Sequence, residues 1–192
     1  MAGETLRTVN QMLANWPDNT QGLISPLDGR DMIVSEAVGV GFLLLDNGPV
    51  TVPIPAQDVW VQINSLITPI QFAGNFWQLD GNQAFTESYT AQGITVPPGT
   101  ERLTTFDVGM LVSKVGGGTN TYEFSLFADG VNTATTGYVD VFTADPEYVT
   151  ITTSRLPDYS LAETFDARVR CLDGTADLTL DEFRFAVQSV PV

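Results

Sequence analysis

From residue 41 onward, apolar and polar residues alternate in short runs, and this alternation constrains the fold more than any other feature of the chain. Successive side chains of a β-strand point to opposite faces of its sheet, so each run predicts a strand with one buried face. The expected buried positions are Val59, Val61 and Ile63; Phe106, Val108, Met110 and Val112; Tyr122, Phe124 and Leu126; Val149, Ile151 and Thr153; Phe165, Ala167, Val169 and Cys171; and Phe183, Phe185 and Val187.

Turn-forming sequences separate these runs. Gly, Pro, Asn and Asp gather at 46–48, 80–81, 97–99, 116–118, 129–130 and 173–174. About eight to ten short strands at this spacing favour a mainly β fold, an antiparallel jelly-roll β-sandwich rather than a small barrel. Residues 50–56 include Pro53 and Pro55, so we expect an edge strand or an extended connector there.

The chain before residue 39 follows a different pattern. Apolar residues recur at helical intervals over 2–15, and Pro17 would end that helix because proline disfavours helical geometry in the residue before it. Ser25 is a good N-cap for a second helix. We therefore expect two parts, an N-terminal α-helical attachment segment over 1–38 and a jelly-roll domain over 39–192.

Composition excludes several classes of function. The chain has 23 acidic and 8 basic residues and a net charge of −15, which disfavours nucleic acid and anionic membrane surfaces as partners. It has no histidine, the commonest general base and metal ligand. No signal peptide is evident, and the longest apolar stretch, 38–45, is far too short to span a membrane. We expect synthesis in the cytoplasm without membrane insertion.

The chemically reactive side chains favour a non-enzymatic protein without metal or cofactor. Cys171, the single cysteine, lies in an apolar alternation and is expected to be a small buried hydrophobe rather than a reactive thiol. Carboxylates gather near the C-terminus, where a glycoside-hydrolase pair, a calcium site and solvated loops are the alternatives, and solvated loops are favoured. The residues concerned are Asp166, Asp173, Asp177, Asp181 and Glu182, of which Asp173, Asp177 and Asp181 are the calcium candidates.

A group of aromatic residues is the candidate recognition surface. Aromatic rings anchor protein interfaces and stack on sugars, so an interface or trimer contact, core packing and a glycan site are all open for them. The residues are Trp60, Phe72, Phe76, Trp77 and Tyr89.

Two stretches resemble known families. Residues 13–31 resemble the leader of tailed-bacteriophage fibre and virion-surface proteins, through an Asp-Asn-Thr-x-Gly-x-Ile-Ser core at 18–25 and Asp-x-Arg-Asp at 28–31. Residues 122–130 and the closing strands over 165–190 are similar to the complement- or tumour-necrosis-factor-like jelly rolls at the ends of such proteins. Many members carry long fibrous spacers and this sequence has none, which favours a compact capsid decoration protein, head fibre or short tail fibre.

The resemblance implies a homotrimer on the virion surface, anchored to capsid or tail proteins, with a head that stabilises the capsid or binds a host-surface glycan. The apolar face of the leader would be buried in a partner or trimer bundle, or against its own sandwich. A carbohydrate-binding or depolymerase-type sandwich domain is the alternative, and a cellular regulatory jelly roll is a third. The residues expected to attach the protein are Leu6, Val9, Leu13, Trp16, Asp18, Asn19, Thr20, Gly22, Ser25, Arg30 and Asp31.

Overall fold

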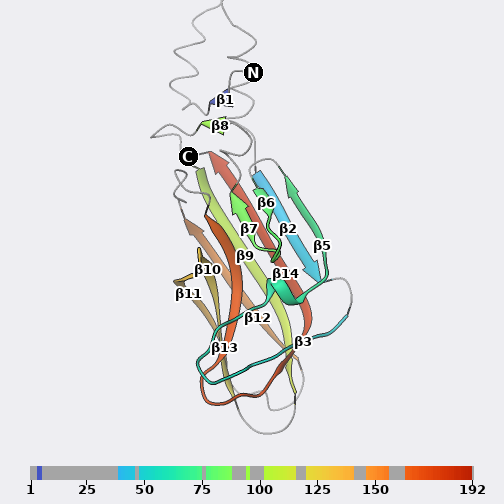
Figure 1. Cartoon of the computed structure of the whole chain (residues 1–192). Coiled ribbons are helices and arrows are strands. Elements are labelled where there is room, and N and C mark those ends of the chain that lie inside the picture. The colour runs from blue at the N-terminus through green and yellow to red at the C-terminus, as the bar shows by residue number, and fades with distance from the viewer. Residues whose placement is uncertain are drawn as a thin grey trace, which may run out of the picture.

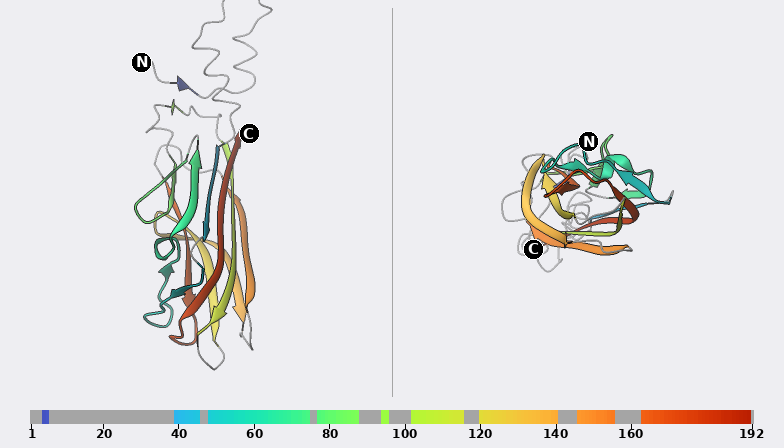
Figure 2. Two further views of the ribbon diagram at one scale, coloured as in Figure 1. Left: turned by 90° about the vertical axis from the view of Figure 1, so that its right-hand side faces the viewer. Right: turned by 90° about the horizontal axis from the view of Figure 1, so that it is seen from below.

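Two six-stranded sheets lie face to face in the computed structural model of this chain (Figures 1 and 2). Apart from a short parallel pair, β1 (Glu4–Thr5) with β8 (Ile94–Thr95), the strands pair antiparallel. The structure describes residues 4–5, 39–45, 48–74, 77–87, 94–95, 102–115, 120–140, 146–155 and 163–191.

The first sheet has the order β12-β9-β14-β2-β5, with β3 also paired to β14. Its strands are β12 (Glu147–Arg155), β9 (Arg102–Lys114), β14 (Leu178–Pro191), β2 (Gly39–Leu45), β5 (Pro69–Gly74) and β3 (Val50–Val52). The second sheet has the order β11-β10-β13-β7-β6, with β4 also paired to β13. Its strands are β11 (Val131–Asp140), β10 (Thr121–Ala128), β13 (Thr164–Cys171), β7 (Phe85–Glu87), β6 (Trp77–Leu79) and β4 (Val61–Gln62).

The chain crosses between the sheets repeatedly. It passes from β9 in the first sheet to β10 and β11 in the second, then to β12, β13 and β14 in alternate sheets. From β9 onward, successive strands therefore lie in different sheets except at the β10–β11 hairpin, and the two central strands of the first sheet, β9 and β14, come from distant parts of the chain. This is the connectivity of a jelly roll, and the predicted fold class is confirmed.

The core lies between the sheets and is built from most of the predicted positions. Aromatic rings fill its centre, where Phe106 and Phe165 from opposite sheets have ring centroids 4.4 Å apart. Trp77 is 2% exposed, and its Nε1 donates a hydrogen bond to the buried Ser189 Oγ at 3.1 Å. Cys171 is a buried free thiol, as predicted.

The turn at 129–130 is a two-residue hairpin between β10 and β11, as the sequence predicts. Asp129 and Gly130 both have positive φ, 48° and 78°, the backbone conformation of a type I′ turn. Ala128 pairs with Val131 across it. The turn matches the right-handed twist of the strands and fixes their register.

The predicted strand at 59–64 is wrong for most of its length. Only Val61–Gln62 pair as a strand, Val59 is 43% exposed, and a 3-10 helix, η1 (Asn64–Leu66), follows. Asn64 explains why the chain leaves the strand for this 3-10 helix. Its side-chain amide is fully buried, accepts a hydrogen bond from Ala167 N at 2.9 Å and donates one to Gln83 O at 2.9 Å. A buried amide needs such partners, and an extended chain would carry Asn64 away from them.

The predicted exposed face of β10 is also wrong. Glu123, Ser125 and Phe127 alternate with the core residues, yet they are 5%, 0% and 4% exposed. Side chains of Trp60 and β13 cover this outer face of the second sheet, as described below.

The predicted N-terminal helices lie outside the described residues. Within the span 2–15, the structure describes only residues 4–5, which form β1 rather than helix. Strand β2 begins at Gly39, where the jelly-roll domain was expected to start. In the part of the chain that is described, no helix has the length and apolar character needed to cross a membrane.

Candidate functional site

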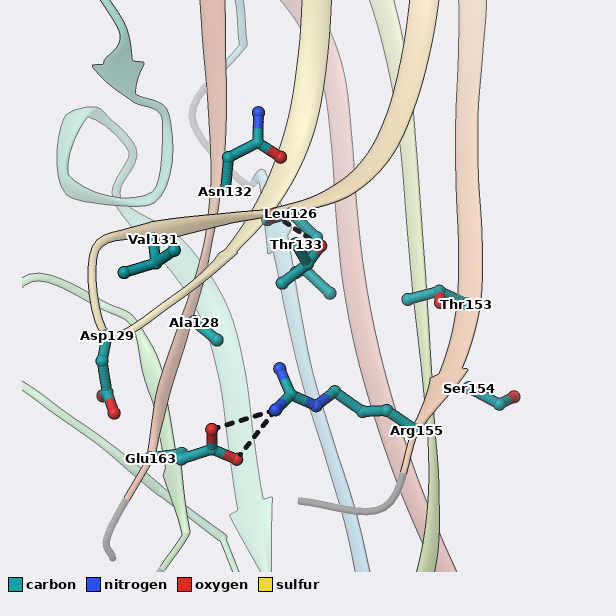
Figure 3. Close-up of a pocket in the computed structure, with 10 residues that line it drawn as sticks. All are labelled: Leu126, Ala128, Asp129, Val131, Asn132, Thr133, Thr153, Ser154, Arg155 and Glu163. Atoms are coloured by element: carbon teal, nitrogen blue, oxygen red, sulfur yellow. Dashed lines mark hydrogen bonds and ion pairs between the residues drawn. The ribbon is translucent and has the colours of Figure 1, made fainter. Parts of the chain in front are cut away.

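A pocket of about 550 Å³ lies between the two sheets, where edge strand β11 of the second sheet runs beside edge strand β12 of the first (Figure 3). Apolar side chains of Leu126, Ala128 and Val131 line one part of it. Its polar lining includes Thr133 on β11, Thr153 and Arg155 on β12, and Asp129 and Glu163 beside the hairpin and β13. This mixture of apolar surface and a few polar groups is typical of small-molecule sites.

An ion pair joins the two sides of this pocket. Arg155 extends from the end of β12 toward Glu163, and its Nη2 lies 3.0 and 3.3 Å from the two carboxylate oxygens (Figure 3). The guanidinium also lies over the Phe165 ring, 5.3 Å from its centroid. The Glu163 side chain is 11% exposed and that of Arg155 31%. The carboxylate is therefore held in place and the guanidinium remains partly accessible.

Hydrogen bonds fix the walls of the pocket. Asp129 N donates to Thr164 O and Asp129 Oδ1 accepts from Thr164 N, both at 2.8 Å, which fastens the hairpin to the start of β13. Thr133 Oγ1 donates to Leu126 O at 2.8 Å across the same hairpin. The pocket is thus formed before any ligand enters, which lowers the entropy lost on binding.

Sequence reasoning did not identify this pocket, although one signal was present. Arg155 continues the inward series Val149, Ile151 and Thr153, so alternation places its charge on the buried side of β12. A charged residue at an inward position needs a partner. Nothing in the pattern indicates that Glu163 is that partner.

The C-terminal carboxylates have separate hydrogen-bond partners. Asp177 Oδ1 accepts from Ile54 N at 2.9 Å and Asp181 Oδ2 accepts from Ser113 Oγ at 2.8 Å. Asp166 pairs with Arg168, with Nε 2.6 Å from its Oδ1. Among the described residues, no group of three or more potential ligands could hold a metal ion. The calcium candidates Asp173, Asp177 and Asp181 therefore do not converge on one site.

Asp173 fastens a loop to the start of β10. Its Oδ1 accepts from Thr121 N at 2.9 Å and from Asn120 Nδ2 at 3.2 Å, and its Oδ2 accepts from Thr121 Oγ1 at 3.1 Å. These bonds, the one from the Thr121 backbone above all, hold the pKa of the carboxyl below its ordinary value of 3.8. The Asp173-Gly174 loop is therefore tied to the neighbouring strand.

The predicted aromatic residues do not form one described surface. Trp77 belongs to the core, while Trp60 is half-buried on the outer side of the second sheet, where its ring packs edge-on against Phe127 at 5.0 Å. Phe72 lies on β5, but its side chain is outside what the structure describes, as are Phe76 and Tyr89. The attachment residues from Leu6 to Asp31 also lie outside the described residues.

Trp60 belongs to a layer of arginine and aromatic side chains that covers the second sheet. Arg170 lies over the Trp60 ring at 4.7 Å, and Arg168 lies over the Phe127 ring at 4.3 Å. Arg170 Nε also donates to Glu123 Oε2 at 2.6 Å. The part of this outer face formed by β10 and β13 is therefore covered by side chains of the chain itself.

The outer face of the first sheet is more open, and we call it the open face. Tyr148 on β12 is 60% exposed and Ile70 on β5 is 50% exposed. Between them, Arg184 and Asp107 form an ion pair with Nη2 and Oδ2 2.6 Å apart. Half-buried apolar residues of the same face are Phe42, Leu44, Leu111 and Ala186.

Comparison with known proteins gives a distant structural likeness. No protein-family model matches the chain, and no curated protein matches it. Among solved structures, it is similar to Eiger TNF from S. frugiperda, with a TM-score of 0.44 and 10% sequence identity over 81% of this chain and 92% of that chain. At this distance the likeness says nothing about function, and the fold description rests on the strand order.

Proposed function

We propose that this chain is a non-enzymatic structural protein of a tailed-phage virion. In this proposal the segment 1–38 attaches a homotrimer to capsid or tail proteins, and the jelly roll forms the head exposed on the virion surface. The head stabilises the capsid or adheres to the host. The leader resemblance at 13–31 is what points to a virion.

The structural observation that carries the attachment role is the position of Gly39, where the chain enters the sandwich. Gly39 pairs with Ser189, Ser189 with Thr104, and Thr104 with Arg155, so these four residues form one row across the first sheet. This row lies near the end of the sheet where β14 finishes (Figure 1). A segment preceding Gly39 therefore joins the sandwich at one end. Attachment through that segment would leave the opposite end, beyond Lys114, directed away from the particle.

The open face supports self-association. A contiguous apolar surface is typical of an interaction site, and on this face the half-buried Phe42, Leu44, Leu111 and Ala186 lie on the strands between the exposed Tyr148 and Ile70 or beside them. Tyr148 and Ile70 lie on this face, whereas Arg168, Arg170 and Trp60 cover β10 and β13 of the other sheet. The contrast favours the first sheet as the contact between copies, with threefold symmetry taken from the family resemblance.

The net charge of −15 suits a protein exposed at high local concentration, because mutual repulsion keeps it soluble. It also supports the expectation that nucleic acid is no partner. In this proposal the protein is made in the host cytoplasm, needs no cofactor and is then assembled onto the virion.

Two measurements test the proposal. Particles assembled with the protein lacking residues 1–38 should carry no bound copies, and normal occupancy would refute the attachment role. Light scattering of the full chain should give a trimer of about 62 kDa, three times the 20.8 kDa of one chain. Substituting Ile70 with aspartate should shift that mass toward the monomer, whereas Val59→Asp, a matched exposed position outside the open face, should leave it unchanged.

The second candidate is the carbohydrate-binding or depolymerase-type domain, and the pocket beside Arg155 and Glu163 is the observation that favours it. Incubating the protein with host polysaccharide and measuring the length of the polysaccharide chains distinguishes a carbohydrate-binding domain from a depolymerase. Shortened glycans would support a depolymerase and overturn the non-enzymatic proposal.

A further inference from the structure

We propose that the pocket between β11 and β12 is a binding site for a neutral saccharide of one or two sugar rings. The inference requires neither the virion location nor the trimer, so its failure would leave the attachment proposal standing. Conversely, finding that the protein is a monomer that does not attach to particles would leave the sugar-binding proposal standing.

The dimensions of the pocket suit such a ligand. Its volume of about 550 Å³ falls within the range of about 300–1,000 Å³ that is usual for small-molecule sites. Its position between the edges of two sheets places it on the flank of the sandwich, whereas the open face is the outer side of the first sheet. A trimer formed through the open face would therefore not use these lining residues as its central contact.

The polar groups match the hydroxyls of a sugar. A sugar hydroxyl both donates and accepts, so it needs donors and acceptors side by side. The Arg155 guanidinium supplies donors and the Glu163 carboxylate supplies acceptors within 3.0 Å of each other. Thr153 adds a hydroxyl from β12. Charged groups give stronger hydrogen bonds than neutral ones, and here both signs are present together.

The apolar part of the lining suits the C–H surface of a sugar ring. Ala128 and Val131 flank the hairpin turn, and both line the pocket. Val131 is 69% exposed, so its side chain offers a hydrophobic contact surface at the pocket. Burying such surface under a ligand removes it from water and therefore favours binding.

The charges decide against ionic ligands. The lining carries two carboxylates, Asp129 and Glu163, and one guanidinium, Arg155, which Glu163 already neutralises. The lining has one more carboxylate than guanidinium, and the whole chain has a net charge of −15, so an acidic sugar would be repelled. A cationic ligand would compete with Arg155 for Glu163. A neutral saccharide meets neither obstacle.

Saturation-transfer NMR on the purified full chain tests the proposal. The probes are glucose, galactose, N-acetylglucosamine, lactose and maltose, with glucuronic acid and glucosamine as charged comparisons, each at about 10 mM to detect a Kd near 1 mM. Transfer to at least one neutral sugar, and weaker transfer to both charged ones, is the expected result. No transfer to any neutral sugar, or stronger transfer to a charged one, would overturn the proposal.

Matched variants locate the binding. Val131→Trp should fill the pocket and weaken binding by about tenfold or more, since the added ring occupies the volume that the ligand needs. Val115→Trp places the same ring at another exposed valine, 46% exposed, beyond the far end of β9, and should leave binding unchanged. Thermal melts check that both variants fold. Equal affinity in the two variants would show that the sugar binds elsewhere and would refute the site.

A second pair of variants tests the chemistry. Thr153→Val removes the pocket hydroxyl at constant shape and should weaken binding by about two- to tenfold, the effect of one net hydrogen bond. Thr150→Val makes the same change on the exposed side of β12 and should have no effect. Unchanged affinity in Thr153→Val would contradict the recognition assigned to this hydroxyl.

Discussion

Replacing Gly41 with alanine tests how closely the two sheets are packed. A Cβ at Gly41, on β2 of the first sheet, would lie 2.5 Å from Phe85 Cε1 and 3.0 Å from Val187 Cγ1. Phe85 lies on β7 of the second sheet and is fully buried. Its ring packs edge-on against Phe185, with centroids 5.2 Å apart, so it has little space into which it can move.

The cost of this added methyl group can be estimated. Over-packing a close-packed core typically costs about 1–3 kcal/mol. In a chain of 192 residues, each kcal/mol lowers Tm by about 2–4 °C, so Gly41→Ala should melt about 2–12 °C below the parent protein. Urea unfolding should show a lower midpoint with an unchanged slope.

A control and a rescue make the test specific. Gly81→Ala adds the same methyl group where no atom lies within 4 Å, and it should change stability by less than about 0.5 kcal/mol. Phe85→Leu removes ring atoms, so it should cost less in the Gly41→Ala background than alone. If Gly41→Ala is as stable as Gly81→Ala, or if the two core changes are additive, the proposed contact between β2 and β7 is wrong.

Three further predictions concern single side chains. Asn64→Ala should destabilise the fold by about 1–3 kcal/mol in denaturant unfolding, chiefly because the buried Ala167 N–H loses its partner; a change below about 0.5 kcal/mol, the size of a surface effect, would contradict this. Arg170→Met should cost about 1.5–3 kcal/mol by leaving the buried Glu123 carboxylate without its arginine, and Glu123→Gln in that background should recover part of the loss. Because the pKa of Asp173 is lowered in the folded state, its contribution is present above the ordinary value of 3.8 and is lost as pH falls through the lower folded pKa. Asp173→Asn should therefore lose less stability on acidification below about pH 4 than the parent protein, and identical acid unfolding curves would refute the role of this carboxylate.

The sequence predicts the inward face of the sandwich well. Alternation identifies Phe106, Val108 and Met110, and the Asp129-Gly130 pair predicts the hairpin, because both depend on local chemistry. A residue's position in a strand determines which face it occupies, and the turn residues determine where strands reverse.

The outer face of the second sheet could not be predicted in this way. Alternation identifies Glu123 and Phe127 as the residues opposite the core, but burial there depends on a cover supplied by Trp60, more than sixty positions earlier in the chain. Arg168 and Arg170 appear in the sequence as solvated charges, whereas in the structure their guanidinium groups lie over aromatic rings. Only the pairing of β10 with β13 brings these groups together.

Only the Arg155 side of the pocket could be predicted from the sequence. The inward position of Arg155 follows from alternation along β12, but Glu163 precedes β13, which lies in the other sheet. The approach of the two residues results from the crossing between sheets, and a local pattern carries no information about that crossing.

An image reconstruction of an intact virion tests the proposed attachment through residues 1–38. We expect threefold density for the jelly roll on the particle surface, with the Gly39 and Pro191 end of the sandwich toward the capsid or tail and the Lys114 end outward. Density in which the Lys114 end faces the particle, or particles without this protein, would contradict it.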